Sequence, residues 1–316
     1  MAWLRKDKRL PGWTSFGFSP QQIDVARVRV NASGRPEVLV CDSYKIEGSA
    51  TESLAQLRKS LKLDRGRCTT LLGPADYQLL QLEAPNVPAA ELKAAATWRV
   101  KDLIDYPVER AAIEVLTIPG ANGGNRTAQL FAVAAPDDKI RQRAKIFQDA
   151  QVALDAIDVQ ELAQRNIAAL LETEGRALAM VSFDATGGLL TITFAGELLL
   201  ARNLDITVAQ LVDAGEERRT QLLERVGLEL QRSLDHFDRQ SGGMVVAKLL
   251  VSALPAGVGL PEYLTSNLSV PAEALELAAA LDFARVPELK SPERQAQCIK
   301  VLGAALRDIV KPANAP

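Results

Sequence analysis

Side chains that could perform acid-base chemistry are scarce in this chain of 316 residues. The single histidine, His236, stands between Asp235 and Asp238 in a segment with helical periodicity. Successive positions on a helix diverge by about 100°, so these side chains cannot converge on one atom. We interpret the cluster as a solvated helix end, and we expect no catalytic residue in the chain.

The cysteines indicate neither a metal site nor a disulfide framework. Cys41, Cys68 and Cys298 are odd in number, far apart in the chain and in no CxxC pair. Such usage fits a reducing cytosol. With one histidine, the chain also lacks the usual imidazole ligands, so we expect no metal ion.

Composition and charge narrow the class of partner. The chain is 47% hydrophobic and 24% charged, which is typical of a globular protein with a large core. A net charge of −2 gives no reason to expect nucleic acid as a partner. No apolar run approaches the roughly 20 residues of a membrane span, and no signal core opens the chain, so we expect a cytoplasmic location.

Residues 1–14 form a basic tail before the first strand. Four lysines and arginines stand there between Trp3 and Trp13. The mix could touch an anionic membrane surface weakly, and a frayed, solvated tail is the alternative. We therefore expect a flexible tail and at most a peripheral membrane contact.

The central segment predicts a β-α-β module. Pro88 favours a helix start and Pro107 a helix stop, so one helix is expected from Ala89 to about Asp105. Strand-like runs precede and follow it, at 77–82 and 112–118. We expect a partner to dock on this module.

The remaining pattern is a duplication. Three short strands, a helix and a further strand are expected over 15–72, and the same order recurs over 178–251, offset by roughly 165 residues. Two copies of such a unit predict a duplicated α/β fold with a cleft between the copies.

Several stretches resemble a known family. They are LLGPADYQLLQLEAPNVPAAELKAAATWRVKDLIDYPVE, QLFAVAAPDDKIRQRAKIFQDAQVALDAIDV and LELQRSLDHF, together with the first hairpin. Through these stretches the chain resembles the actin-like PilM group of pilus-assembly proteins, and more narrowly its MSHA-biogenesis branch, MshI. The resemblance extends from about Trp13 to Val310. The resemblance implies an actin-like fold, which is a duplicated ribonuclease H-like fold. It places the first half at 15–172, with a small inserted subdomain at about 73–136, and the second half at 173–316.

The resemblance also implies a cellular role. Proteins of the PilM type lie in the cytoplasm beneath the inner membrane and hold the short cytoplasmic N-terminal tail of a PilN-type membrane protein. The expected partner is therefore a PilN-like protein, with the pilus assembly ATPase complex as a further candidate.

The nucleotide site that the family resemblance implies departs from its usual chemistry. Actin-like sites carry an Asp-x-Gly turn in each half, whose carboxylate holds Mg²⁺ and whose glycine lets backbone amides approach phosphate. Gly17 and Ser19 occupy these positions in the first half, and Ser182 and Asp184 in the second. The glycine-rich adenosine loop is reduced to the segment around Gly257. We expect a degenerate site with no cofactor.

The sequence supports two alternative functions from different classes. The first is a non-catalytic adaptor of a type IV pilus machine. The second is an ATP-binding switch whose phosphate contacts come from backbone amides and from Gln21, Gln22 or Thr186. A small-molecule kinase of the same superfold would need the missing metal-binding carboxylate.

The adaptor hypothesis assigns a peptide-binding surface to the inserted subdomain. A short apolar peptide needs a preformed groove with an anchor. We expect that groove to be lined by five side chains: Leu80, Leu82, Trp98, Leu103 and Tyr106. Trp98 has two interpretations, as an interface anchor or as a core residue of its helix.

Overall fold

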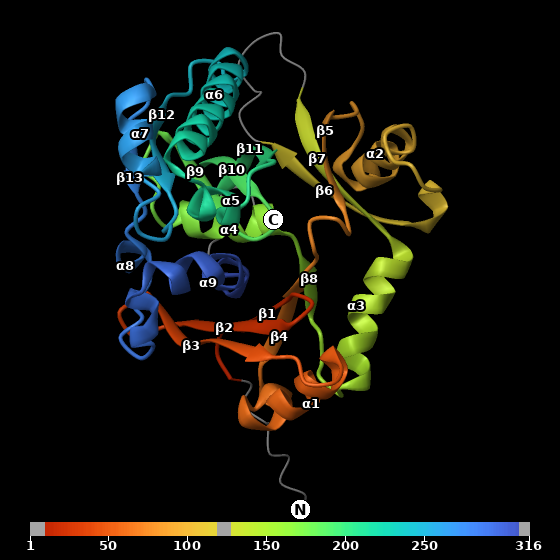
Figure 1. Ribbon diagram of the computed structural model, residues 1–316. Helices are drawn as coiled ribbons and strands as arrows, with labels where there is room; N and C mark the ends of the chain where they lie inside the picture. Colours follow the sequence, from red (N-terminus) through yellow and green to blue (C-terminus); the bar gives the residue numbers. More distant parts are fainter. Residues whose placement is uncertain (1–9, 119–127, 310–316) are drawn as a thin grey trace, which may run out of the picture.

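The computed structural model describes residues 10–118 and 128–309. The sequence predicts a glycine-rich loop at 119–125 and a last helix at 294–310. That loop, Val310 at the end of that helix and most of the predicted tail (1–9) lie outside the described residues. The described part of the chain builds three β-sheets with helices packed on them (Figure 1).

The first sheet has the order β3-β2-β1-β4-β8. Its strands are β1 (Trp13–Phe18), β2 (Gln22–Val30), β3 (Pro36–Lys45), β4 (Arg67–Leu71) and β8 (Ala156–Asp158). The first three strands form an antiparallel meander, and β4 and β8 join it in parallel. Its outer face carries α1 (Ala50–Ser60) and α3 (Asp137–Asp149), which enclose Phe16 and Phe147 in one core.

The second sheet repeats this plan with the order β11-β10-β9-β12-β13. Its strands are β9 (Ala177–Phe183), β10 (Gly188–Phe194), β11 (Glu197–Leu204), β12 (Val246–Val251) and β13 (Ala272–Ala274). The helices that follow its strands in sequence are α5 (Val208–Asp213), α6 (Glu216–Gln240), α7 (Leu260–Asn267) and α8 (Leu277–Ala280). The predicted duplication is confirmed, because both sheets share one strand order and one pattern of directions.

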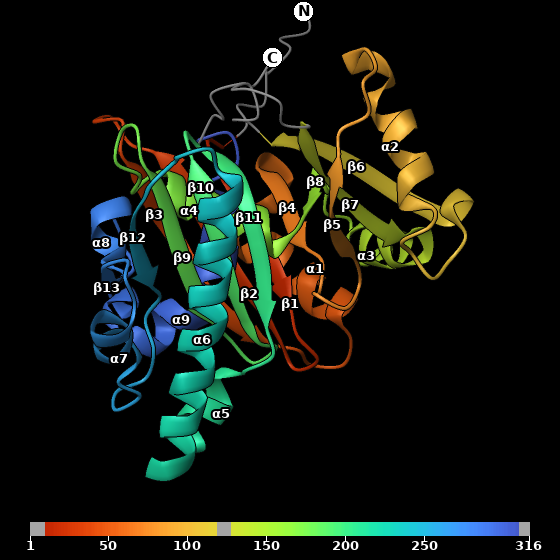
Figure 2. The same ribbon diagram turned by 90° about the horizontal axis from the view of Figure 1, so that it is seen from above.

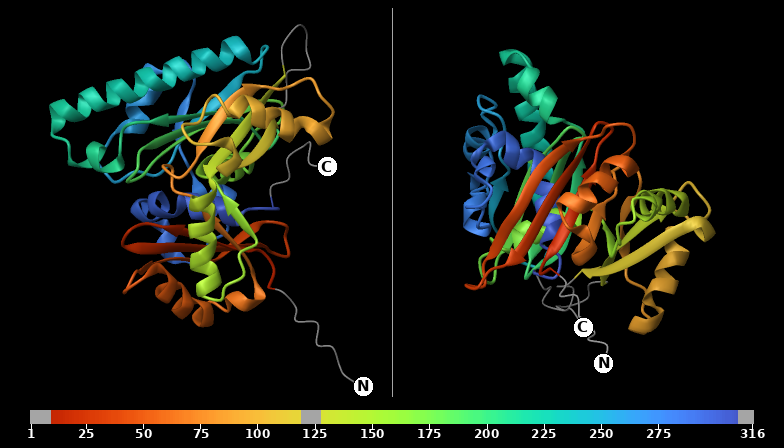
Figure 3. Two further views of the ribbon diagram at one scale, coloured as in Figure 1. Left: turned by 90° about the vertical axis from the view of Figure 1, so that its right-hand side faces the viewer. Right: turned by 90° about the horizontal axis from the view of Figure 1, so that it is seen from below.

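The long helix α6 covers the outer face of the second sheet. The spacing of apolar residues in the sequence predicts a helix at about 220–239, and α6 extends slightly further at its start. Leu223, Val226, Leu230 and Phe237 recur on one side of it and are buried against strands of the sheet. Figures 2 and 3 show α6 lying along that outer side of the molecule.

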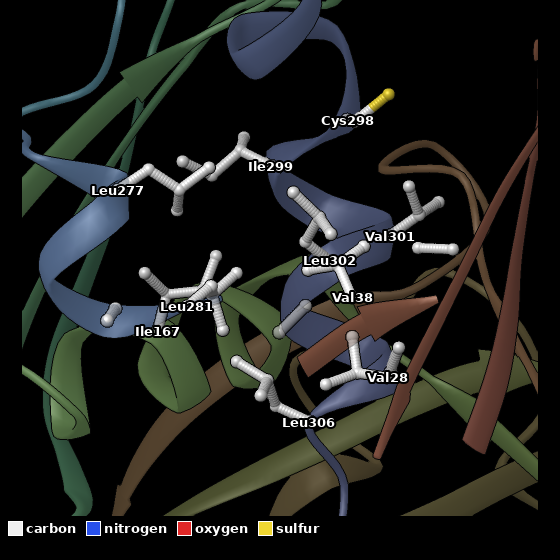
Figure 4. Close-up of a cluster of buried hydrophobic side chains, with 14 of the residues drawn as sticks. Val28, Val38, Ile167, Leu277, Leu281, Cys298, Ile299, Val301, Leu302 and Leu306 are labelled. Atoms are coloured by element: carbon white, nitrogen blue, oxygen red, sulfur yellow. The ribbon is translucent and has the colours of Figure 1, made fainter. Parts of the chain in front are cut away.

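Two helices cross between the halves. They are α4 (Gln160–Ala169) and α9 (Pro292–Ala305). Although α4 lies at the end of the first half in sequence, it packs against β9, β10 and β11, whereas α9, late in the second half, packs against β1, β2 and β4. Figure 4 shows Leu302 of α9 beside Val38, Leu277 facing Ile299, and Leu281 beside Ile167 of α4. Each half therefore holds a helix that the other half supplies.

The third sheet is fully antiparallel, with the order β5-β7-β6. It consists of β5 (Gln78–Glu83), β6 (Ala111–Ile118) and β7 (Gln129–Pro136), and α2 (Leu92–Val100) covers one face. Figure 1 shows this unit beside the second half, with α2 on its outer side.

The prediction of one helix from Ala89 to Asp105 is wrong. A 3-10 turn spans Ala89–Glu91, α2 itself ends at Val100, and turns follow. The chain carries aspartates at 102 and 105. Aspartate has a low helix propensity, and its negative charge interacts unfavourably with the dipole at a helix C-terminus. Ile104 packs back into the core under α2, which turns the chain away from the helix axis.

None of the helices in the described ranges combines the length and the hydrophobicity that crossing a lipid bilayer requires. In the same ranges, no three His, Cys, Asp or Glu side chains converge as a metal-binding group would.

Candidate functional site

A cavity of about 390 Å³ lies between the two halves. Its walls include the β1–β2 hairpin turn, the β9–β10 hairpin turn, the start of α4 and the side of α9 from Glu293 to Val301. These are the same turns in which the family resemblance places phosphate contacts. Gly17, Ser19, Gln22, Asp184 and Thr186, which were assigned to a degenerate nucleotide cleft, all line the cavity.

The first-half wall is closed by its own side chains. The amide of Gln22 donates to Ser19 Oγ at 3.1 Å, so the hydroxyl is held within its turn. Gln22 Nε2 donates to Asp24 at 3.2 Å. Burial raises the pKa of Asp24, against the opposing effect of hydrogen bonds from Ser43 and Gln22 and of the nearby Arg294 guanidinium. This wall therefore presents a carboxyl group that sequence analysis did not assign to the cleft.

The second-half wall is organised by Asp184. Its Oδ1 accepts the backbone amide of Thr186 at 2.7 Å and the Thr186 hydroxyl at 2.6 Å, which closes the turn. Its Oδ2 lies 2.5 Å from Nζ of Lys300 on α9. Burial raises the pKa of Asp184, but the charge and hydrogen bond of Lys300 together with the Thr186 contacts outweigh it, so the pKa lies below its usual 3.8.

Lys300 is the functional group that sequence analysis missed. Its Nζ also donates to the side-chain oxygen of Gln160, at the first position of α4. Among the described residues that line the cavity, Lys300 is the sole cationic side chain, whereas Asp24, Asp184 and Glu293 are acidic. The sequence predicts a helix over 294–310, but nothing in its pattern shows that Lys300 reaches the other half.

Three residues assigned to the cleft lie outside the cavity lining. Ser182 is buried behind it, where its hydroxyl donates to Gln164 of α4 at 2.6 Å. Gln21 is exposed in the first turn and does not line the cavity. Gly257 lines a separate cavity of about 360 Å³, and its carbonyl accepts Arg219 at 3.0 Å.

The five residues assigned to a peptide groove divide between two environments. Leu82 is buried under α2 with Ala96 and Val100, and the partly buried Leu80 packs against this core of the inserted unit. Trp98 and Leu103 are on the outside, with exposed fractions of 70% and 52%. The core interpretation of Trp98 is therefore wrong, and so is the expectation that all five side chains line one open groove.

Tyr106 occupies an intermediate position. It is partly buried, and its hydroxyl is enclosed without a hydrogen-bond partner among the described residues. Burial, and then the charge of Asp105, raise its pKa. Leu80 and Leu82 do not line an open groove because side chains alternate along β5, so both lie on the face that α2 covers.

Comparison with known proteins gives matches at the level of structure. No protein-family model and no curated protein matches the chain. A chain of the PilM-PilN type IV pilus biogenesis complex superposes with a TM-score of 0.73 at 19% identity, covering 96% of this chain and 100% of that one.

Two further structures are more distant. The cytoplasmic domain of EpsL, an inner-membrane component of the type II secretion system of Vibrio cholerae, has a TM-score of 0.47 at 14% identity, covering 95% of this chain and 99% of that chain. A Bacteroides thetaiotaomicron protein with an actin-like ATPase fold has a TM-score of 0.49 at 12% identity, with 94% and 99% covered. The duplicated sheets, the exchanged helices and the full-length match with the PilM-PilN complex establish that this chain has the actin-like fold.

Proposed function

We propose that this protein is a non-catalytic adaptor of a type IV pilus assembly machine, of the MSHA type, which binds the cytoplasmic tail of a PilN-like inner-membrane protein. The observation that carries the proposal is the exposure of Trp98 on the outer side of α2, in a fold that matches a chain of the PilM-PilN complex over nearly its whole length.

Trp98 has the properties of a peptide anchor. Tryptophan supplies a large contact area at low cost in conformational entropy and is enriched among interface residues that carry binding energy. Leu103 adds a second exposed apolar side chain just beyond the end of α2. The ammonium group of Lys101 lies 5.7 Å from the Trp98 ring centre, so a cation already covers part of the ring. An apolar side chain of the partner would replace water around this ring.

The cleft supports the non-catalytic part of the proposal. A magnesium nucleotide brings several negative charges, whereas the described residues that line the cavity present three carboxyl groups and one ammonium group. That ammonium group is already paired with Asp184. The side-chain hydroxyl groups at the two turns, those of Ser19 and Thr186, form hydrogen bonds within their own hairpins. We infer that the donor set does not fit MgATP and that the cleft is a degenerate nucleotide site.

The cellular location follows from the partner. We propose a cytoplasmic protein that is peripheral to the inner membrane and held there by the PilN-like tail, with the assembly ATPase complex as a second neighbour. Expressed without its partner, the protein should stay in the supernatant after membranes are pelleted, and co-expression with the partner should move it to the pellet.

A direct binding test uses a synthetic peptide of the partner's cytoplasmic tail. Calorimetry should show saturable binding, and hydrogen exchange should slow over 92–104 when the peptide is present. Binding with protection confined to the cleft hairpins would move the site away from Trp98. Absence of binding at millimolar peptide would contradict the adaptor proposal.

The alternative is an ATP-binding switch of the same machine, and the existence of a cavity between the two hairpin turns is the observation in its favour. A fluorescent ATP analogue with Mg²⁺ distinguishes the two. Saturable binding in the micromolar range would support the switch and contradict the degenerate site.

A further inference from the structure

Lys300 belongs structurally to the first half of the molecule. Its helix, α9, is fixed to the first sheet by Ser15, whose hydroxyl donates to the Val301 carbonyl at 2.5 Å. Contact at this point is tight, since a Cβ atom at Gly17 would lie 2.9 Å from Cγ1 of Val301. At Lys300, α9 is therefore fixed to the β1–β2 hairpin, whereas at Gly303, one turn further on, it crosses α4.

Asp184 belongs to the second half. It follows β9 directly, and its backbone amide donates to the Gly187 carbonyl at 2.9 Å. The helix α4 moves with this half, because Gln164 Nε2 donates to the carbonyls of Met180 and Leu189 at 2.9 and 3.1 Å. The contact of Lys300 with Asp184 and with Gln160 of α4 therefore joins the two halves across the cleft.

The pair is shielded from solvent and fully partnered. The side chain of Lys300 is 19% exposed and that of Asp184 is 27% exposed, so water and salt screen their attraction less than at an open surface. The second oxygen of Asp184 is held by Thr186, which fixes the carboxylate toward Lys300. By contrast, the ion pair of Lys248 with Glu273, at 2.8 Å, lies within the second sheet and joins no two halves.

We propose that the Lys300–Asp184 ion pair is a built-in latch that holds the two halves closed over the cleft without any ligand. The latch uses Lys300, the one cationic side chain among the described residues that line the cavity, to neutralise the carboxylate of the opposite wall. Separation of the halves must break it, because its two members are fixed to different sheets. The inference concerns the cleft alone and does not depend on the identity of the partner.

Hydrogen exchange of the whole protein, followed by mass spectrometry, tests the latch. In Lys300→Met, amides of both hairpin turns, 17–22 and 183–188, should exchange at least about fivefold faster than in the wild type, a factor equal to roughly 1 kcal/mol of opening free energy. Lys300→Arg keeps the charge and should restore slow exchange. Lys248→Met removes a lysine from an ion pair within one half and should leave both turns unchanged.

The turn at 17–22 is the discriminating readout, since none of the contacts of Lys300 described above is made to it. Faster exchange at 183–188 alone would show a local turn contact and overturn the latch. Unchanged exchange at both turns, or an even rise across all helices and strands, would overturn it as well. If Lys300→Met does not fold, Asp184→Asn is measured by the same criteria.

Discussion

A Cβ atom added at Gly303 of α9 would lie 2.0 Å from the carbonyl oxygen of Ala163 in α4. The two helices thus cross with backbone against backbone, and Asn166 Nδ2 donates to the Gly303 carbonyl at 2.9 Å at the same point. Both helices are exchanged between the halves, so this crossing joins the two sheets. No other residue type than glycine fits at 303 without moving one helix.

Gly303→Ala should therefore destabilise the protein by about 2–4 kcal/mol, because an overpacked helix crossing has to shift. Gly215→Ser is the matched control, since no atom lies within 4 Å of a Cβ there and the residue caps α6. Urea unfolding followed by circular dichroism measures both. Equal stability of Gly303→Ala and wild type would contradict the crossing geometry.

The two leucines once assigned to the same groove should behave differently. Leu82→Ala removes a buried side chain under α2 and should cost about 2–4 kcal/mol of stability. Leu103→Ala removes a half-exposed side chain and should change stability by less than about 0.5 kcal/mol. Thermal unfolding of the two variants side by side decides this, and similar losses would show that Leu103 is also packed.

The succession of strands and helices along the chain and the long helix α6 were predictable because they depend on local periodicity. Strand-like runs at 15–19, 23–30, 178–183 and 189–194 predicted paired strands, and the apolar spacing of α6 predicted one buried side. The cleft was located through its two hairpin turns. Lys300 was not predictable, because the pairing with Asp184 depends on how α9 is exchanged between halves, which no local pattern contains.

In the inserted unit, too, the local sequence pattern did not predict the tertiary contacts. The strand periodicity over 77–82 was correct, but it does not say which face α2 will cover, so Leu80 and Leu82 were assigned to an open groove. The end of α2 was misjudged because the return of Ile104 to the core is a tertiary contact. The exposure of Trp98 depends both on which face of the sheet α2 covers and on where α2 ends.

Removing the carboxylate charge of Asp184 should change the stability of the protein in a pH-dependent way. The folded-state pKa of Asp184 is lowered, so its contribution to stability is present above the unfolded pKa of about 3.8 and is lost as the pH falls below it. Asp184→Asn should thus be less stable than wild type at pH 7, and the difference should shrink from pH 4 to pH 3. Denaturant titrations at these pH values measure it, and a difference independent of pH would exclude the charge as the cause.

Millimolar MgATP should leave the melting temperature unchanged within about 1 °C. A Kd weaker than ~1 mM adds at most a few tenths of a kcal/mol at 1 mM ligand, since stabilisation grows with the logarithm of ligand concentration over Kd. Differential scanning calorimetry with and without MgATP measures the shift. A rise of several degrees would contradict the degenerate cleft.

The central claim is that Trp98 anchors a partner peptide, and calorimetric titration of Trp98→Ala with the cytoplasmic tail of a PilN-like protein tests it most directly. The variant should bind at least about 30-fold more weakly than wild type, which corresponds to ~2 kcal/mol, with its melting temperature unchanged. Val245→Ala, at a 60% exposed site beyond α6, should bind like wild type. Full-strength binding by a stably folded Trp98→Ala protein would contradict the account.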